Sequence, residues 1–141
     1  MGAFRPTYRF TVAPEQCDEL GHLNVQHYIQ FMYLGGMELT AAIGLSRDAI
    51  AQRRLGLAAV RMECDFLREL RAGEAVLVES AVESVGGKSL TFQHRLQLAG
   101  TAEEAMRAVV TGLLLDLRTR KAVPIPDDIR AAAEALAAAS G

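Results

Sequence analysis

The chain has 141 residues, of which half are hydrophobic and 6% are aromatic, and its formal net charge is −2. This length is typical of one domain, and we expect a single domain over residues 1–141. A charge so close to neutral provides no basic surface for nucleic acid, so nucleic-acid binding is not expected.

Cysteine content and hydropathy bear on the compartment. Cys17 and Cys64 are too few for a disulfide framework, and their neighbours predict buried free thiols. Residues 1–7 are polar and lack the apolar run of a signal peptide. No segment has the roughly 18 uninterrupted apolar residues of a membrane helix. We therefore expect a cytoplasmic protein without a membrane segment.

The first third of the chain predicts a strand, a loop and a long helix. Residues 8–13 alternate loosely and are rich in strand-forming types, whereas residues 14–22 are polar and typical of a loop. Apolar residues are spread around most of a helix over 25–43, a pattern usual for a buried helix. Gly44 is expected to end this helix.

A short helix and a run of strands should follow. Ser46 is expected to cap the short helix, which ends near Arg54. The strands are predicted at 60–66, 74–85, 90–98 and 106–117. Glycine-containing turns between them indicate antiparallel pairing, and period-2 patterning indicates a sheet covered on one face. An alanine-rich helix is expected over 127–140. One long helix against one antiparallel sheet is an α+β arrangement.

Most of the polar residues that suggest chemistry lie between Cys17 and Tyr28, just before and at the start of the long helix. A helix start presents unpaired N–H groups and the positive end of the macrodipole, which can hold a developing oxyanion. A carboxylate beside it can attack a thioester carbonyl or orient a water to do so. Asp18 is a residue of this type at this place.

Structural roles are alternatives for each of these residues. An aspartate before a helix is commonly a cap or turn residue, and Asn24 is most simply the N-cap of the long helix. His22 can be a hydrogen-bonding loop residue, Tyr28 a core residue with its hydroxyl paired, and His94 a satisfied core histidine. No spacing of a metal site is recognised, so no metal is expected.

The motif Asp18-x-x-Gly21-His22-x-Asn24-x-x-x-Tyr28 resembles the signature of the 4-hydroxybenzoyl-CoA thioesterase family within the hotdog superfamily. Residues 65–74 and 116–126 are similar to other parts of that family. The resemblance implies a hotdog fold, in which a long central helix is wrapped by a five- or six-stranded antiparallel sheet. It also implies at least a dimer, with the active site between subunits.

The resemblance assigns roles to residues. The catalytic carboxylate falls on Asp18 and the oxyanion-binding backbone amide on Val25, while His22 and Asn24 would orient Asp18, water or the carbonyl. Three further residues are expected to contact substrate, namely Tyr28, Lys88 and Ser89. No metal or redox cofactor is implied.

The sequence also departs from related patterns. Plant acyl-carrier-protein thioesterases have a catalytic Asp and His at the spacing of Asp18 and His22, but their intervening Asn falls on Leu20. The Glu and Arg that many relatives carry along the helix fall on Tyr33 and Gly36. Each glycine of the Gly35-Gly36 pair costs a helix about 1 kcal/mol relative to alanine. Close approach to the sheet, a partner helix or a ligand would explain them.

We expect an acyl-CoA thioesterase that releases a free acid and CoA, or a carrier-protein thiol. The alternatives are a hotdog hydratase or dehydratase acting on acyl thioesters, and a non-catalytic acyl-CoA-binding module. An exposed sheet edge on so short a chain predicts a homodimer or homotetramer.

Overall fold

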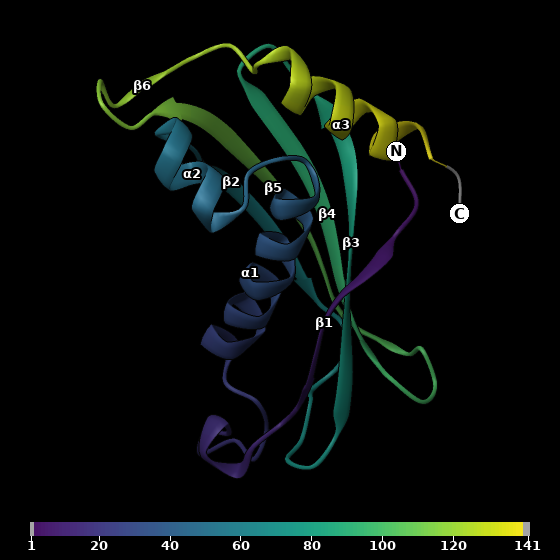
Figure 1. Cartoon of the computed structure of the whole chain (residues 1–141). Coiled ribbons are helices and arrows are strands. Elements are labelled where there is room, and N and C mark those ends of the chain that lie inside the picture. The colour runs from purple at the N-terminus through teal and green to yellow at the C-terminus, as the bar shows by residue number, and fades with distance from the viewer. Residues whose placement is uncertain (1, 140–141) are drawn as a thin grey trace.

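One long helix lies across the concave face of a curled antiparallel sheet in the computed structural model, which describes residues 2–139 (Figure 1). The helical elements are η1 (Pro14–Gln16), α1 (Val25–Ala42), α2 (Arg47–Arg53) and α3 (Asp127–Ala138). The strands are β1 (Arg5–Thr11), β2 (Leu55–Phe66), β3 (Ala75–Val85), β4 (Ser89–Leu98), β5 (Glu104–Asp116) and β6 (Lys121–Ala122).

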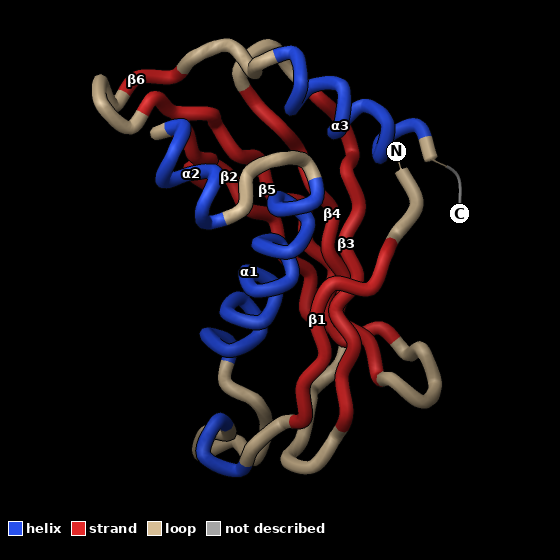
Figure 2. The backbone as a smooth tube through the Cα atoms, viewed as in Figure 1, coloured by secondary structure: helices blue, strands red, loops and turns tan. Residues whose placement is uncertain are grey.

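The sheet has the order β1-β3-β4-β5-β2, and β6 extends it by pairing with the end of β5 (Figure 2). All pairings are antiparallel. The predicted α+β architecture with a five- or six-stranded antiparallel sheet is therefore confirmed. Strand β2 ends the sheet on one side and β1 on the other, so each has one side without a neighbouring strand among the described residues.

Helix predictions were accurate because their signals are local. The Ser46 side chain caps α2 by accepting a hydrogen bond from Ala49 N–H at 3.1 Å. Helix α1 begins at Val25, as expected, with Ile43 as its C-cap. The prediction for α3 extended to Ser140, which lies outside the described residues.

The start of β2 was predicted wrongly at Val60, whereas the strand begins at Leu55. Ala59 pairs with Gly112 and Arg61 pairs with Thr111, so Val60 is an extra residue in β2, a β-bulge. A bulge interrupts the period of two, and the alternation that follows residue 60 does not continue before it. The prediction for the first strand was also displaced, since β1 begins at Arg5.

The hydrophobic core consists of two clusters along α1. Tyr28, Phe31 and Met32 belong to the first cluster, towards the start of the helix. Leu39 and Ile43 belong to the second, which α3 joins through Ile129. The helix is less enclosed than predicted, because Tyr33 at its middle is 61% exposed.

Gly35 is a point of close approach between α1 and the sheet. A Cβ at this position would lie 2.7 Å from Thr7 Oγ1 and 2.8 Å from Val78 Cγ1, well inside van der Waals contact. The expected close approach to the sheet is therefore observed at this glycine. Its neighbour Gly36 faces His94, with 3.5 Å between the position of a Cβ and His94 Cε1.

Cys17 and Cys64 are free thiols, as predicted, but both are only partly buried. They lie at the margin of the first core cluster and not inside it. Within residues 2–139, no helix has the length and apolar character needed to cross a bilayer.

Candidate functional site

The loop before α1 is a tight turn held by backbone hydrogen bonds. Asp18 N–H donates to His22 O at 3.1 Å, and Gly21 N–H donates to Asp18 O at 3.0 Å. Gly21 has a φ of 82°, a left-handed conformation that glycine adopts without strain. The buried Leu23 anchors the loop, because its N–H donates to Leu70 O at 2.7 Å. The Asp18 side chain is thereby presented from a fixed backbone.

Both carboxylate oxygens of Asp18 are oriented by neighbours. Oδ1 accepts from Leu20 N–H at 3.0 Å, and Oδ2 accepts from Asn24 Nδ2–H at 2.8 Å. The Asn24 hydrogen bond is the main cause that lowers the pKa of Asp18 below its ordinary value, followed by the Leu20 N–H. Asp18 is therefore an ionised turn residue, and each oxygen keeps lone-pair capacity for a substrate or a water.

Asn24 joins this carboxylate to the start of α1. Its Oδ1 accepts from Gln26 N–H at 3.2 Å, so it is the N-cap of α1, as predicted. Val25 is the first residue of α1, and its side chain is exposed. No residue in the described range accepts a hydrogen bond from Val25 N–H. One side chain, that of Asn24, thus connects a carboxylate to a helix start whose first N–H is open.

The histidines of this segment have separate contacts. His22 Nδ1 lies 3.1 Å from Leu23 O and donates to it, which leaves Nε2 outside that contact. The charge of His22 contributes to the lowered pKa of Asp18 after the two hydrogen bonds. His27 pairs with Gln30 in the first turns of α1. His22 is therefore brought near Asp18 by the turn, whereas His27 faces along the helix.

Tyr28 supports the loop from within the core. Its hydroxyl donates to Arg68 O at 3.0 Å and accepts from Leu70 N–H at 3.1 Å, and its ring packs edge-on against Phe66. Burial is the main cause that raises the pKa of its hydroxyl. The predicted substrate contact of Tyr28 stays a prediction, and within this chain its hydroxyl has two protein partners.

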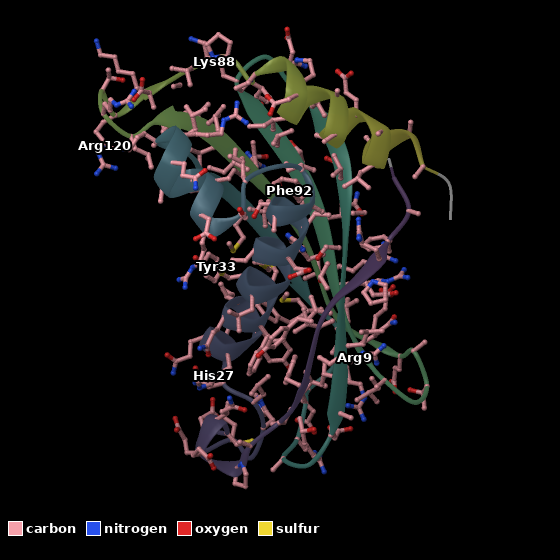
Figure 3. The ribbon with its side chains drawn as sticks, in the orientation of Figure 1. Arg9, His27, Tyr33, Lys88, Phe92 and Arg120 are labelled. Atoms are coloured by element: carbon pink, nitrogen blue, oxygen red, sulfur yellow. The ribbon has the colours of Figure 1, made fainter. Side chains whose placement is uncertain are left out.

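Lys88 and Ser89 lie at the other end of the sheet from Asp18. They follow the β3–β4 turn, and the pairing of Ser89 with Leu113 places them near the end of β5. Figure 3 shows Lys88 and His27 at opposite ends of the molecule. Within this chain, Lys88 and Ser89 are therefore not brought together with Asp18.

A cavity of about 700 Å³ lies between α1, α2 and the strands β2, β4 and β5, and sequence reasoning did not predict it. Its wall is mostly apolar and includes Tyr33, Phe92 and Met62. The cavity does not include Asp18 or any residue of its loop. The signals that could have indicated it were Gly36, which leaves open space on α1, and a histidine on the apolar face of residues 90–98.

His94 is the one histidine that lines this cavity. It is 4% exposed, and its Nδ1 lies 2.7 Å from Ser80 Oγ, so the predicted core histidine is indeed paired at this nitrogen. Burial lowers its pKa to about 4, and the ring is therefore neutral near pH 7. Ser80 Oγ is in turn 2.9 Å from Thr7 Oγ1.

Comparison with known proteins identifies relatives of the whole chain. A family model described as the thioesterase-like superfamily matches residues 12–133. Betainyl-CoA thioesterase of Pseudomonas aeruginosa is 30% identical over 135 residues, which are 94% of this chain and 84% of that protein. A chloroplastic acyl-acyl carrier protein thioesterase of Arabidopsis thaliana is 26% identical over 115 residues, or 82% of this chain, and the match spans 60% of the plant protein.

A solved structure supports the same relationship. A thioesterase of Thermus thermophilus, complexed with coenzyme A and Zn, is 26% identical and superposes with a TM-score of 0.81 over 97% of each chain. The predicted family and the hotdog fold are confirmed by these matches, and thioester hydrolase is the enzyme class that the relatives share. Since the family model covers most of the chain and the Pseudomonas relative aligns with nearly all of it, the chain belongs to the thioesterase-like superfamily.

Proposed function

We propose that this protein hydrolyses acyl-CoA thioesters, with its chemistry at Asp18 and the start of α1. The observation that carries the proposal is the ionised Asp18 carboxylate, held by Asn24 beside the open N–H of Val25. Acyl-CoA is favoured over an acyl-carrier protein because a CoA thioesterase aligns with more of this chain than the plant enzyme does.

The proposed reaction consumes one water and releases a carboxylic acid and a thiol. Asp18 either attacks the thioester carbonyl, forming an anhydride that water hydrolyses, or takes a proton from the attacking water. Val25 N–H stabilises the carbonyl oxygen as it becomes negative, and the sulfur leaves as a thiolate. Asn24 keeps Asp18 oriented and ionised, and His22 orients water or the carbonyl from the same turn.

We further propose that the active unit is a homodimer formed through β2. The outer side of this strand has no neighbour among residues 2–139, and its apolar side chains are open to solvent, with Val60, Met62 and Phe66 exposed by 59%, 40% and 48%. Such an edge is a liability unless it is paired. A second copy that pairs its own β2 antiparallel across a two-fold axis covers the edge symmetrically.

This pairing would complete the site across two copies. Strand β2 ends beside the start of α1, where Phe66 contacts Tyr28, and it begins just after α2, near the other end of α1. Antiparallel pairing therefore brings the Asp18 loop of one copy towards α2 and the cavity of the other. Arg47 and Arg54 line the cavity at that end, and Lys88 lies at the same end of the sheet, where these cations suit the phosphates of CoA.

The two partly exposed free thiols are consistent with a reducing compartment, and we propose that the protein is cytoplasmic.

The hydratase alternative is less well supported than thioester hydrolysis. The matched family and the relative that aligns with most of this chain are thioesterases, and within one copy no Asp or Glu of the described residues lines the cavity beside His94.

A thiol-release assay over a panel of acyl-CoAs tests the proposed function. Catalytic release of free CoA supports hydrolysis and excludes hydration as the sole activity. Binding of acyl-CoA without turnover, measured by calorimetry, would instead identify a binding module. Light scattering in the same buffer tests the dimer, and a stable monomer at micromolar concentration would contradict it.

A further inference from the structure

We propose that His94 selects acyl groups that carry a hydroxyl, by accepting a hydrogen bond from that hydroxyl inside the cavity between α1 and the sheet. The inference rests on the proposed function, because it assigns the cavity to the acyl group of the thioester. The inference depends on whether His94 Nε2 donates or accepts a hydrogen bond. The chemistry proposed at Asp18 does not involve this nitrogen.

The tautomer of His94 follows from a chain of hydrogen bonds that ends at a carbonyl. Thr7 Oγ1 lies 3.2 Å from Val78 O, and a carbonyl only accepts, so the Thr7 hydroxyl proton is used in that bond. All three contacts can be hydrogen bonds at once in only one direction, in which Thr7 Oγ1 accepts from Ser80 Oγ–H at 2.9 Å. Since a hydroxyl has one proton, Ser80 Oγ accepts from His94 Nδ1–H at 2.7 Å.

Nε2 is therefore the unprotonated nitrogen of a neutral ring. A neutral imidazole has one donor and one acceptor, and the donor is already used at Nδ1. Burial favours the neutral form, since the pKa of His94 is lowered to about 4. Within the described chain, no residue makes a hydrogen bond to Nε2. Every fully buried side-chain nitrogen or oxygen of these residues has a partner, so the unpaired Nε2 must have some contact with solvent. Nε2 is thus an acceptor open to the cavity.

Gly36 keeps this acceptor accessible. A Cβ at Gly36 would lie 3.5 Å from His94 Cε1 and 3.7 Å from Nε2, so the missing side chain leaves that edge of the ring uncovered. The surrounding wall is apolar, and side chains such as Tyr33 and Phe92, labelled in Figure 3, come to it from α1 and β4. The cavity therefore combines a mostly apolar surface with a buried ring nitrogen that can accept a hydrogen bond.

The chemistry of the ligand follows from this combination. A hydroxyl on an otherwise apolar acyl chain donates to Nε2 and buries its hydrocarbon against the wall. A keto oxygen at the same carbon has no proton and would face the Nε2 lone pair. An unsubstituted chain leaves Nε2 unpaired. A buried polar group without a partner is costly, so we expect about a tenfold or greater preference for the hydroxyacyl group.

The first experiment measures kcat/KM for acyl-CoAs of one chain length with a hydroxyl at successive carbons, alongside the keto and unsubstituted compounds. We expect at least one hydroxyl position to be preferred over both by about tenfold or more. In His94→Leu, the ratio of hydroxyacyl to unsubstituted kcat/KM should fall towards one. Absence of a preferred position in the wild type, or a ratio that survives in His94→Leu, overturns the proposal.

Gly36→Ala is a second variant that does not depend on replacing a core residue. The new methyl makes ordinary contacts with the imidazole, so the fold is kept, but it covers the edge that carries Nε2. We expect the hydroxyl preference to decrease in Gly36→Ala. Met37→Leu, an apolar exchange elsewhere on the same wall, is the matched control and should keep the preference. Equal ratios in both variants would contradict the assignment.

An activity-independent measurement separates this inference from the proposed function. In ¹⁵N spectra of the histidine rings, the free protein should show His94 protonated at Nδ1 and bare at Nε2. Hydroxyalkyl-CoA thioethers, which cannot be hydrolysed, should shift the Nε2 resonance more than the unsubstituted thioethers do. A protein that shows this shift but releases no CoA from any thioester retains the binding site and loses the proposed activity. A proton on Nε2, or equal shifts, overturns the inference whatever the activity.

Discussion

Asp18 in the loop before α1 and His94 in the cavity are both titratable, and their two environments favour opposite charge states. Asp18 lies in a polar, partly exposed turn, and hydrogen bonds from Asn24 and Leu20 keep it charged. His94 is buried against an apolar wall, which keeps it neutral. At about 1.5 Å per residue, Val25 and Gly36 are separated by about 16 Å along α1.

This difference indicates separate roles for the two regions, with the chemistry at the loop and the recognition of the acyl group in the cavity. A charged carboxylate at a helix start can attack carbon or take a proton from water, whereas the neutral Nε2 of His94 offers a hydrogen-bond acceptor to a group bound in the cavity. The distance between them in one protomer requires either a long acyl group or a second copy that brings its own loop to the cavity. The following predictions separate these functions, beginning with the largest expected effect.

Asp18→Asn tests whether the loop performs the chemistry. The amide keeps the shape of the side chain but removes the charge that attacks carbon or accepts a proton. We expect kcat to fall by about 10² or more, the usual size of such a contribution. Thermal unfolding should change little and serves as the control. Near-normal turnover in the folded variant would remove Asp18 from the mechanism.

Val60→Lys tests whether loop and cavity are joined across β2. A lysine on the exposed edge would place two like charges near the proposed two-fold axis, and edge lysines prevent strand pairing. We expect a monomer by light scattering, with most of the turnover lost. Thr11→Lys puts the same residue on β1, the opposite edge, and should remain dimeric and active. An active Val60→Lys monomer would show that one protomer suffices.

His22→Ala compares a second member of the loop with Asp18. The His22 side chain is fixed by the contact of its Nδ1 with Leu23 O, and it makes no hydrogen bond to the Asp18 carboxylate among the described contacts. We expect a loss of turnover smaller than that of Asp18→Asn and mostly in kcat, because a group near the carbonyl acts in the transition state. Steady-state kinetics of both variants on one substrate give the comparison. An effect confined to KM would make His22 a binding or structural residue.

Gly35→Ala and Gly36→Ala contrast the side of α1 that contacts the sheet with the side that contacts the cavity. A methyl at Gly35 collides with Thr7 and Val78, so we expect a loss of about 1–3 kcal/mol in the free energy of unfolding. A methyl at Gly36 makes ordinary contacts and favours the helix, so a gain of up to about 1 kcal/mol is expected. Denaturant titration measures both. Equal stabilities would mean that α1 can move away from the sheet without cost.

Asn24→Ser separates capping from electrostatics within the loop. The serine hydroxyl still caps α1 but no longer provides the amide donor to Asp18. Since this donor is the main cause of the lowered pKa, its loss raises the pKa of Asp18, and the acidic limb of the kcat/KM profile should move to higher pH. Asn24→Asp should move it further, because the new carboxylate repels the charge of Asp18. An unchanged limb in both variants would show that Asp18 does not govern it.

Local features of the fold were readable from the sequence, and non-local ones were not. The Asn24 and Ser46 caps and the alternation of residues 90–98 need only a few neighbouring residues, and each was predicted correctly. The start of β2 was missed because the bulge at Val60 is defined by its partner strand β5.

The candidate site shows the same limit. Asp18 and Val25 are neighbours in a motif, so their roles could be proposed from sequence. The cavity is formed where Gly36 on α1 meets His94 on β4, and no spacing along the chain reveals that contact. The separation of Lys88 from Asp18 likewise becomes visible only once β4 and β5 are paired.

The hydrogen-bonded series that ends at Val78 O has a consequence for any attempt to change substrate preference. Thr7 lies on β1 and does not line the cavity, yet in the proposed arrangement its single proton sets the direction of each hydrogen bond up to His94. Replacing Thr7 by valine would free the Ser80 hydroxyl to donate to Nδ1, so the other tautomer, with its proton on Nε2, becomes accessible and can bind a carbonyl. A mutant library restricted to the residues of the cavity wall would omit Thr7, the position that changes His94 Nε2 from an acceptor to a donor.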